Sequence, residues 1–319
     1  MNYRARFVFA AWLASVGVGP VAWGQKPADV PNVQADPASD SGMVLAGSGS
    51  ALKSRPGWDF LPSRDGFAFV NHFEGTPPLP KALRDERTTV GAIAKLIAVA
   101  AGGNSADAAY GLCGGMSAAA ADYYLSDTAR PPADAVPERG SPLFEYLVQR
   151  QTDSLGVAAF MAVKFAEWMA LPDAADDWGG VEGRTGLELP GIIERLEKGE
   201  LVPLGLVYRR AGEGALWDNH QVLAYACVRD NGRAVRVRIY DPNWPADDAA
   251  ELKVTLSAPL DETAEVGASP KPVNRATTRQ LGSRKRERPV RGFFAMPYTA
   301  KAEMPPMEAP PAAEPMMNP

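Results

Sequence analysis

Two strand-like segments on either side of a tight turn restrict the fold of this chain more than any other feature. The segments NHQVLAYACVR and RAVRVRIYD flank the turn Asp230–Gly232. The sequence DNG between alternating apolar segments is typical of a β-hairpin. A symmetric turn pairs Arg229 with Ala234, and outward pairing places Val222 opposite Asp241. We therefore expect an antiparallel sheet built around this hairpin.

The pairing also predicts which side chains share a face, because alternate residues along a strand point to the same side. On one face, His220 and Asp241 lie diagonally opposed at the open end, roughly 7 Å apart between Cβ atoms. A one-residue slip would bury Arg236 and Arg238, which favours the stated pairing. The rest of that face is apolar: Val222, Ala224, Ala226, Val228, Val235, Val237 and Ile239. The opposite face is more mixed and is expected to be partly exposed: Gln221, Leu223, Tyr225, Cys227, Ala234, Arg236, Arg238 and Tyr240.

Helical patterns dominate the chain before the hairpin, and further strand patterns surround it. Ser141 is expected to cap one helix, with Pro142 at its first position. Helices first and an antiparallel sheet second predict an α+β fold. The arginine-rich segment 274–291 is expected to be a solvated loop. The expected helices cover 88–102, the residues after Cys113, 141–155, 156–171 and 188–199, and the other expected strands cover 201–210 and 291–298.

The two ends of the chain differ in composition from the middle. Residues 1–24 combine a basic start, an apolar stretch and small residues suited to cleavage, which predicts a signal peptide. An uncleaved membrane anchor is the alternative. Residues 25–56 are expected to be a flexible lead-in and residues 300–319 a disordered tail rich in Pro and Met. One domain over 57–299 remains, in a secreted or periplasmic protein with no membrane span after cleavage.

Charge limits the classes of partner. Removal of residues 1–24 would take away Arg4 and Arg6 and no acid, so the net charge would change from −5 to −7. An acidic chain argues against nucleic acid as a partner. The acid-rich segment 173–186 lacks the spacing of a calcium loop, so we expect no metal and no cofactor.

The sequence contains only two cysteines, Cys113 and Cys227. Export usually leads to an oxidising compartment, in which paired cysteines form disulfides. On the predicted faces, however, Cys227 points away from His220. If Cys113 meets His220, Cys227 cannot readily bridge it, and we therefore expect Cys227 to be a reduced, structural residue.

Cys113 stands at an expected helix start, in the segment GLCGGM. Unpaired amides at a helix N-terminus carry partial positive charge and favour a thiolate. Gly114 and Gly115 remove side chains from the first turn, so that a substrate backbone can approach the sulfur. His220 can take the thiol proton, Asp241 can hold the imidazole tautomer, and the Cys113 N–H can stabilise an oxyanion.

The order of a cysteine at a helix start, a histidine at a strand start and an aspartate at the next strand resembles that of the papain-like cysteine peptidases. GLCGGM is similar to the Cys-Gly helix start of that superfamily, NHQVLAYACV to its histidine strand, and IYDPNW to its Asn/Asp strand. The general arrangement resembles that of the family over residues 58–298, but specific sequence similarity is confined to these three stretches. It implies a papain-like fold, with Cys113 as nucleophile, His220 as general base and acid, and Asp241 as the orienting residue.

The sequence departs from the family pattern at the oxyanion site. The family places a glutamine shortly before the cysteine, whereas residues 100–112 contain none. Asn104 is the nearest amide, and Asn71 is a more distant candidate. Asn243 shares the face of Asp241, so it is a second candidate for orienting the histidine. Asp241 is preferred because a carboxylate stabilises an imidazolium better than an amide does.

These observations predict an exported, monomeric papain-like cysteine hydrolase that cleaves peptide or isopeptide bonds in a peptide or protein substrate. Its Cys-His-Asp triad would act through a thioester acyl-enzyme. Attack by an amine instead of water would make the same machinery a transglutaminase-like acyltransferase. A non-catalytic peptide- or cell-wall-binding domain on this fold is a further alternative, which the absent glutamine favours. A structural protein of the cell envelope would leave the Cys/His/Asp arrangement unexplained.

Overall fold

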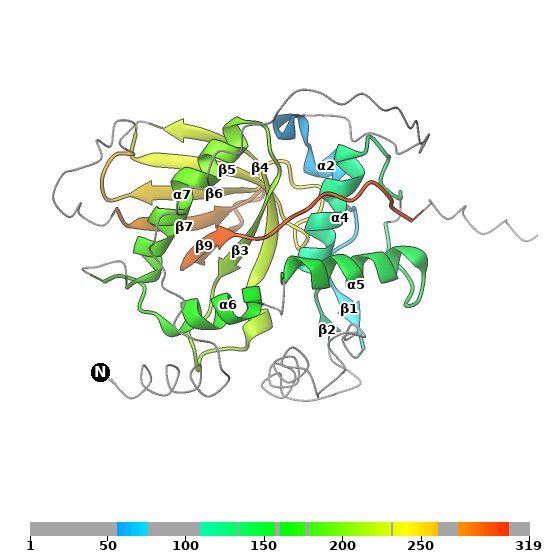
Figure 1. Cartoon of the computed structure of the whole chain (residues 1–319), viewed down its shortest axis with the longest axis horizontal. Helices are drawn as coiled ribbons and strands as arrows, with labels where there is room; N and C mark the ends of the chain where they lie inside the picture. The colour runs from blue at the N-terminus through cyan, green and yellow to red at the C-terminus, as the bar shows by residue number, and fades with distance from the viewer. Residues whose placement is uncertain are drawn as a thin grey trace, which may run out of the picture. The chain divides into compact units, whose positions relative to one another are not determined.

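The chain is a mixed α+β protein, as predicted, with helices first and a curled antiparallel sheet in the C-terminal half (Figure 1). The expected signal peptide, most of the lead-in and the expected helix 88–102 lie outside the described residues. All described residues belong to one structural unit, Gly49–Pro319. The computed structural model describes residues 56–75, 109–132, 134–156, 160–175, 179–230, 232–260 and 274–305.

Seven strands form the large sheet, in the order β8-β7-β6-β5-β4-β3-β9, and every neighbouring pair is antiparallel. The ends of β3, β5 and β7 therefore lie at the same end of the sheet as the start of β4. The strands are β3 (Val202–Val207), β4 (His220–Asp230), β5 (Ala234–Tyr240), β6 (Glu251–Leu256), β7 (Ala276–Leu281), β8 (Glu287–Val290) and β9 (Gly292–Ala295). A separate pair, β1 (Phe73–Glu74) and β2 (Ala109–Tyr110), leads into the first long helix.

The β4–β5 hairpin has the predicted register at its open end and a different one near its turn. Ala224 pairs with Ile239 as predicted, but the register shifts by one residue at Tyr225, so that Cys227 pairs with Val237. A β-bulge of this kind adds one residue to one strand and turns the following side chains to the other face. The predicted pairing is therefore wrong between the bulge and the turn.

The bulge corrects the predicted faces of the hairpin. Beyond it, Cys227 packs with the apolar core on the face that carries Val222, whereas Ala226 packs on the opposite face and Val228 is exposed. The face expected to be partly exposed is buried by helices at Leu223, Tyr225 and Tyr240.

Helix α7 (Val181–Glu197) covers one face of the sheet (Figure 1). Its apolar residues recur at helical spacing and pack against side chains from β3 to β7 and from β9. These contacts form an apolar cluster that holds α7 against the sheet. The helix contributes Leu189, Ile192, Ile193 and Leu196 to that cluster.

Helices α4 (Cys113–Leu125) and α5 (Pro142–Ser154) pack on the other face of β4. As predicted, α5 begins after Ser141, whose hydroxyl accepts a hydrogen bond from the Phe144 amide at 3.3 Å, and Pro142 occupies its first turn. A further helix, α6 (Phe160–Ala170), packs against β3 and β9. Short helical turns are η1 (Gly57–Asp59), α2 (Pro62–Asp65) and η4 (Leu216–Asp218).

Strands β7 and β8 occupy segment 274–291, so the prediction of a solvated loop there is wrong. In β7, Ala276, Thr278 and Gln280 are buried, and Thr277 and Arg279 between them are exposed. The alternation has the period of a strand, but its inward positions are small or polar. Hydrophobicity alone therefore did not reveal this strand.

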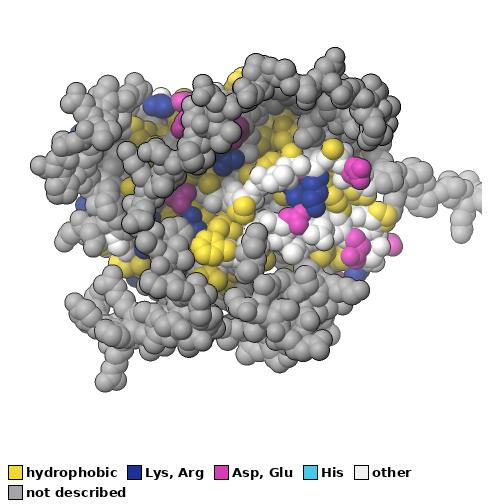
Figure 2. Space-filling model, viewed as in Figure 1, with side chains coloured by type: hydrophobic (Ala, Val, Ile, Leu, Met, Phe, Trp, Pro, Cys, Tyr) yellow, Lys and Arg dark blue, Asp and Glu magenta, His cyan; other side chains and the backbone are white. Residues whose placement is uncertain are grey.

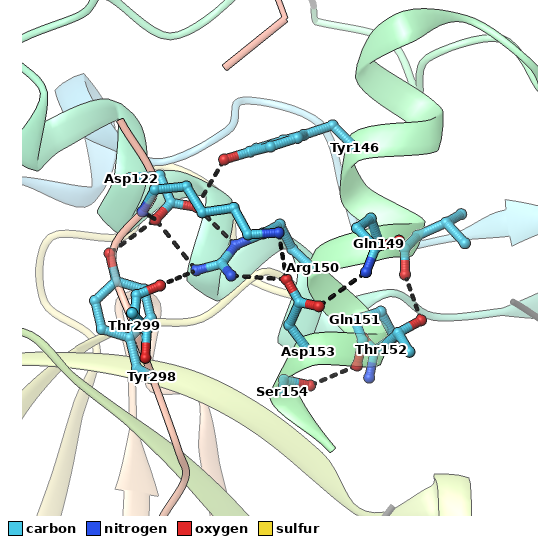
Figure 3. Close-up of polar contacts among 12 residues, drawn as sticks. Asp122, Tyr146, Gln149, Arg150, Gln151, Thr152, Asp153, Ser154, Tyr298 and Thr299 are labelled. Atoms are coloured by element: carbon cyan, nitrogen blue, oxygen red, sulfur yellow. Dashed lines mark hydrogen bonds and ion pairs between the residues drawn. The ribbon is translucent and has the colours of Figure 1, made fainter. Parts of the chain in front are cut away.

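The segment after β9 crosses from the sheet to α4 and α5 (Figures 1 and 3). The buried carboxylate of Asp122 accepts hydrogen bonds from the Tyr298 hydroxyl at 3.0 Å and from the Lys301 main-chain N–H at 2.9 Å. Arg150 pairs with Asp122 at 2.7 Å and donates to the Thr299 carbonyl oxygen at 3.0 Å. The two helices and the end of the sheet are thus joined by one buried polar cluster.

The same contacts continue past the residue at which the disordered tail was expected to begin. Met304 packs against the aromatic cluster of α4, and the Lys301 ammonium lies 2.6 Å from Asp153 of α5. Basic and acidic side chains also gather on the surface over these helices (Figure 2). Residues 300–305 therefore belong with the folded unit.

Candidate active site

Three chain segments bring the predicted site residues together at one end of the sheet. His220 is the first residue of β4 and Asp241 directly follows β5, so both lie at the open end of the hairpin. Cys113 is the first residue of α4, which packs against β4. The Cys113 thiol lies close enough to the His220 side chain to affect its protonation. A thiol, an imidazole and a carboxylate that are distant in sequence are therefore neighbours in the fold.

His220 and Asp241 form a buried pair. The imidazole Nε2 lies 2.6 Å from Asp241 Oδ1, and the two residues are only 4% and 2% exposed. Because Nε2 faces Asp241, Nδ1 is the ring nitrogen that remains for the Cys113 thiol. A carboxylate on one side of the ring and a nucleophile on the other is the arrangement that base catalysis requires.

Opposing effects set the protonation of this pair. Burial disfavours the charged imidazolium, but the charge of Asp241 and hydrogen bonds with Asp241 and Cys113 outweigh it and raise the pKa of His220 to about 10. Burial likewise disfavours the carboxylate, but His220 and the hydrogen bonds that Asp241 accepts hold the pKa of Asp241 below its usual value. An imidazolium beside a carboxylate is therefore the favoured state at neutral pH.

Other groups fix the orientation of the Asp241 carboxylate. The Asn243 main-chain N–H donates to Oδ1 at 2.7 Å, and the Gln280 side-chain amide donates to Oδ2. The Tyr208 hydroxyl donates to Gln280 Oε1 at 2.5 Å, which fixes the orientation of that amide. The Tyr208 ring also stacks on the His220 ring, with centroids 6.4 Å apart. Both partners in the pair are thus held from two sides.

Sequence reasoning missed Tyr208 and Gln280. Gln280 lies in the segment interpreted as a solvated loop, and Tyr208 follows β3 without any motif. The available signal was topological, because if β3 and β4 pair as neighbouring antiparallel strands, the end of β3 lies beside His220 at the start of β4.

The amide side chains proposed for the oxyanion or orienting roles lie in different places. The Asn243 side-chain oxygen accepts a hydrogen bond from Asn71 Nδ2 at 3.1 Å, and not from His220. Asn71 Oδ1 in turn accepts from the Leu112 N–H at 2.6 Å, directly before the cysteine. Asn71 therefore links the nucleophile segment to the loop after Asp241. Asn104 lies outside the described residues.

The double glycine allows close packing at the start of α4. A Cβ atom added to Gly114 would lie 2.5 Å from both Gln221 Oε1 and Ser154 Oγ. The Gly115 N–H donates to Gln151 of α5 at 3.0 Å. Within the described part of the chain, the Cys113 N–H has no hydrogen-bond acceptor, so it is free to bind an oxygen that carries negative charge.

The other cysteine is in a different environment. Both Cys113 and Cys227 are free thiols. Burial, together with the charge of Glu197, raises the pKa of Cys227 to about 11. Cys227 is therefore protonated at neutral pH, as an inert core thiol would be.

Neither a metal site nor a known relative identifies the chemistry. Among the described residues, no group of three or more His, Cys, Asp or Glu side chains is arranged to hold a metal ion. No helix in those ranges combines the length and hydropathy of a membrane span. No protein-family model, curated protein or solved structure matches the chain. The geometry of the site is therefore the basis for a functional proposal.

Proposed function

We propose that this chain is a papain-like cysteine hydrolase that cleaves amide bonds in peptides or proteins through a thioester acyl-enzyme. The observation that carries the proposal is the buried His220–Asp241 contact of 2.6 Å, together with a Cys113 thiol close enough to His220 to affect its protonation. The order of these residues along the chain resembles that of the papain-like peptidases.

Because the imidazolium is the favoured state at neutral pH, the thiol proton already resides on His220 Nδ1, and acylation begins from the Cys113 thiolate. The thiolate attacks the carbonyl carbon of the scissile amide, and the carbonyl oxygen gains negative charge. The unpaired Cys113 N–H is the donor we assign to that oxygen. The imidazolium then gives its proton to the departing amine, and the thioester remains on Cys113.

Deacylation reverses these roles. His220 takes a proton from a water molecule, whose oxygen attacks the thioester carbon, and the thiolate leaves as the product acid forms. Asp241 keeps the imidazole oriented through both half-reactions. An amine in place of water would give acyl transfer from the same intermediate, so the test must detect both products.

The first test is selective alkylation of the two thiols at neutral pH. With a pKa of about 11, Cys227 is a thiolate in only about one molecule in ten thousand at pH 7. Iodoacetamide should therefore label Cys113 at least about a hundredfold faster than Cys227, as read by mass spectrometry of the peptides. Equally slow labelling of both thiols would contradict the proposal.

The second test is turnover. The wild-type protein should cleave members of a peptide library, or transfer their acyl groups to an added amine, and Cys113→Ala should do neither. Cys227→Ala is the matched control and should retain activity. Peptide binding without turnover by the wild type would favour the non-catalytic binding domain instead.

We further propose that residues 1–24 are a cleaved export signal, which would place the enzyme outside the cytoplasm. Their basic start and apolar stretch support this. The mass of the protein recovered from the producing cells should correspond to a chain that begins at Gln25. Recovery of the intact chain in the membrane fraction would favour the uncleaved anchor.

A further inference from the structure

An arginine of β8 lies beside the groups that support the candidate triad. The Arg288 guanidinium carbon lies 3.5 Å from the centroid of the Tyr208 ring, and that ring stacks on His220. The charge of the guanidinium opposes the rise that burial causes in the pKa of Tyr208. The Tyr208 ring therefore contacts both a positively charged group and the imidazole.

Among the described residues this half-buried arginine has no acidic partner, whereas other arginines of the same segment do. Arg286 lies 3.8 Å from Asp247, and Arg291 lies 2.5 Å from Asp173. Across the described ranges, no carboxylate pairs with Arg288, although its side chain is half-buried. A guanidinium has five N–H donors, and stacking uses its flat face and leaves the edge donors available.

We infer that Arg288 is a carboxylate-binding subsite, and that the substrate of this hydrolase carries an acidic group near the scissile amide. The inference rests on the proposed function and specifies its substrate class. A carboxylate matches the planar edge of a guanidinium through two parallel N–H···O bonds. Such a ligand would supply the negative partner that the described chain does not give to Arg288.

Two alkylating reagents that differ mainly in charge test the inference without knowledge of the substrate. Iodoacetate carries a carboxylate, whereas iodoacetamide carries a neutral amide, and both alkylate thiolates. For Cys113, the iodoacetate-to-iodoacetamide rate ratio, normalised to that of a small free thiol, should exceed one. Arg288→Gln should lower this ratio about threefold, the effect of one partly screened charge near the sulfur.

Arg279→Gln is the matched control. It removes the same charge from the neighbouring strand, but its side chain lies on the exposed face of β7. It should leave the ratio unchanged. Arg288→Lys keeps the charge without the planar edge and should retain most of the iodoacetate preference.

Three other results of the alkylation experiment would contradict the inference, and each has a different meaning. An unchanged ratio in Arg288→Gln, with fast labelling by both reagents, would refute the subsite and leave the proposed hydrolase intact. An equal slowing of both reagents would show that Arg288 acts only by positioning Tyr208. Slow labelling of wild-type Cys113 by both reagents would refute the proposed function itself.

Peptides that the wild type cleaves show whether the bound carboxylate is a glutamate side chain or a free C-terminus. In one pair of substrates a glutamate beside the scissile bond is replaced by glutamine, and in the other pair a free C-terminal carboxylate is replaced by an amide. The wild type should have a lower kcat/KM for the neutral peptide of one pair, and Arg288→Gln should cleave both peptides of that pair with the same kcat/KM. Equal kcat/KM for all the peptides in the wild type would refute the inference.

Discussion

Two glycine-to-alanine substitutions in helices should change the free energy of unfolding in opposite directions. The first is at Gly115, where α4 packs closely against α5. A Cβ on Gly115 would lie less than 2.5 Å from the main-chain oxygen of Leu147 and 3.0 Å from its carbonyl carbon. Because backbone cannot rotate away, the helices would have to separate by about 1 Å, and overpacking of this kind costs about 1–3 kcal/mol. Alanine recovers about 1 kcal/mol of helix propensity. Weakening of the Gly115–Gln151 hydrogen bond adds a further cost of about 1 kcal/mol.

Gly115→Ala should therefore lower the free energy of unfolding by about 2 kcal/mol. Gly191 in α7 is the control, because an added Cβ there would meet nothing within 4 Å. Gly191→Ala should raise the free energy of unfolding by about 1 kcal/mol. Urea unfolding followed by circular dichroism measures both. A Gly115→Ala variant as stable as the wild type would refute the reasoning, since it would mean that the helices do not pack at this distance.

Three further predictions concern the buried charges. Asp241→Asn should lower kcat by about 10²–10⁴-fold, with little change in KM, because it removes the group that orients and stabilises the imidazolium; an unchanged kcat would remove Asp241 from the triad. Since the pKa of His220 is raised from 6.5 to about 10, its contribution to stability is complete below pH 6.5 and is lost as the pH rises through about 10. The wild type should therefore lose stability across that range, whereas Asp241→Asn should show a flatter pH profile in urea unfolding. Arg150→Met should destabilise by about 3 kcal/mol because it leaves the Asp122 carboxylate buried and unpaired, whereas Arg195→Met, which breaks an exposed ion pair, should cost less than about 1 kcal/mol in the same assay.

The sequence was most informative where a short local pattern determines geometry. The turn at Asp230–Gly232 was sufficient to place His220 and Asp241 at one open end, because pairing in a hairpin propagates outward from the turn. The α+β class and the start of α5 at Ser141 were predicted from similarly local signals.

The bulge at Tyr225 was not predictable from alternation, since the strand stays apolar on both sides of it. It nonetheless leaves the site end of the hairpin in the expected register, so the error affects Cys227 and spares His220. The hydrogen bonds that orient the Asp241 carboxylate were not predicted, because Gln280 and Tyr208 reach it only through strands that are neighbours in the sheet but distant in sequence. Such contacts depend on strand order, and apart from the turn between β4 and β5 we identified no local pattern that encodes the order from β3 to β7.

The buried Asp122 carboxylate has a consequence for the order in which the protein can assemble. It sits in the helix that begins with Cys113, yet two of its donors, Tyr298 and Lys301, come 176 and 179 residues later. Until those residues have been synthesised and docked, the helix must bury a carboxylate whose hydrogen bonds are incomplete. We therefore expect the thiol to reach its reactive environment only at the last stage of folding, so that an incompletely synthesised chain would be unreactive.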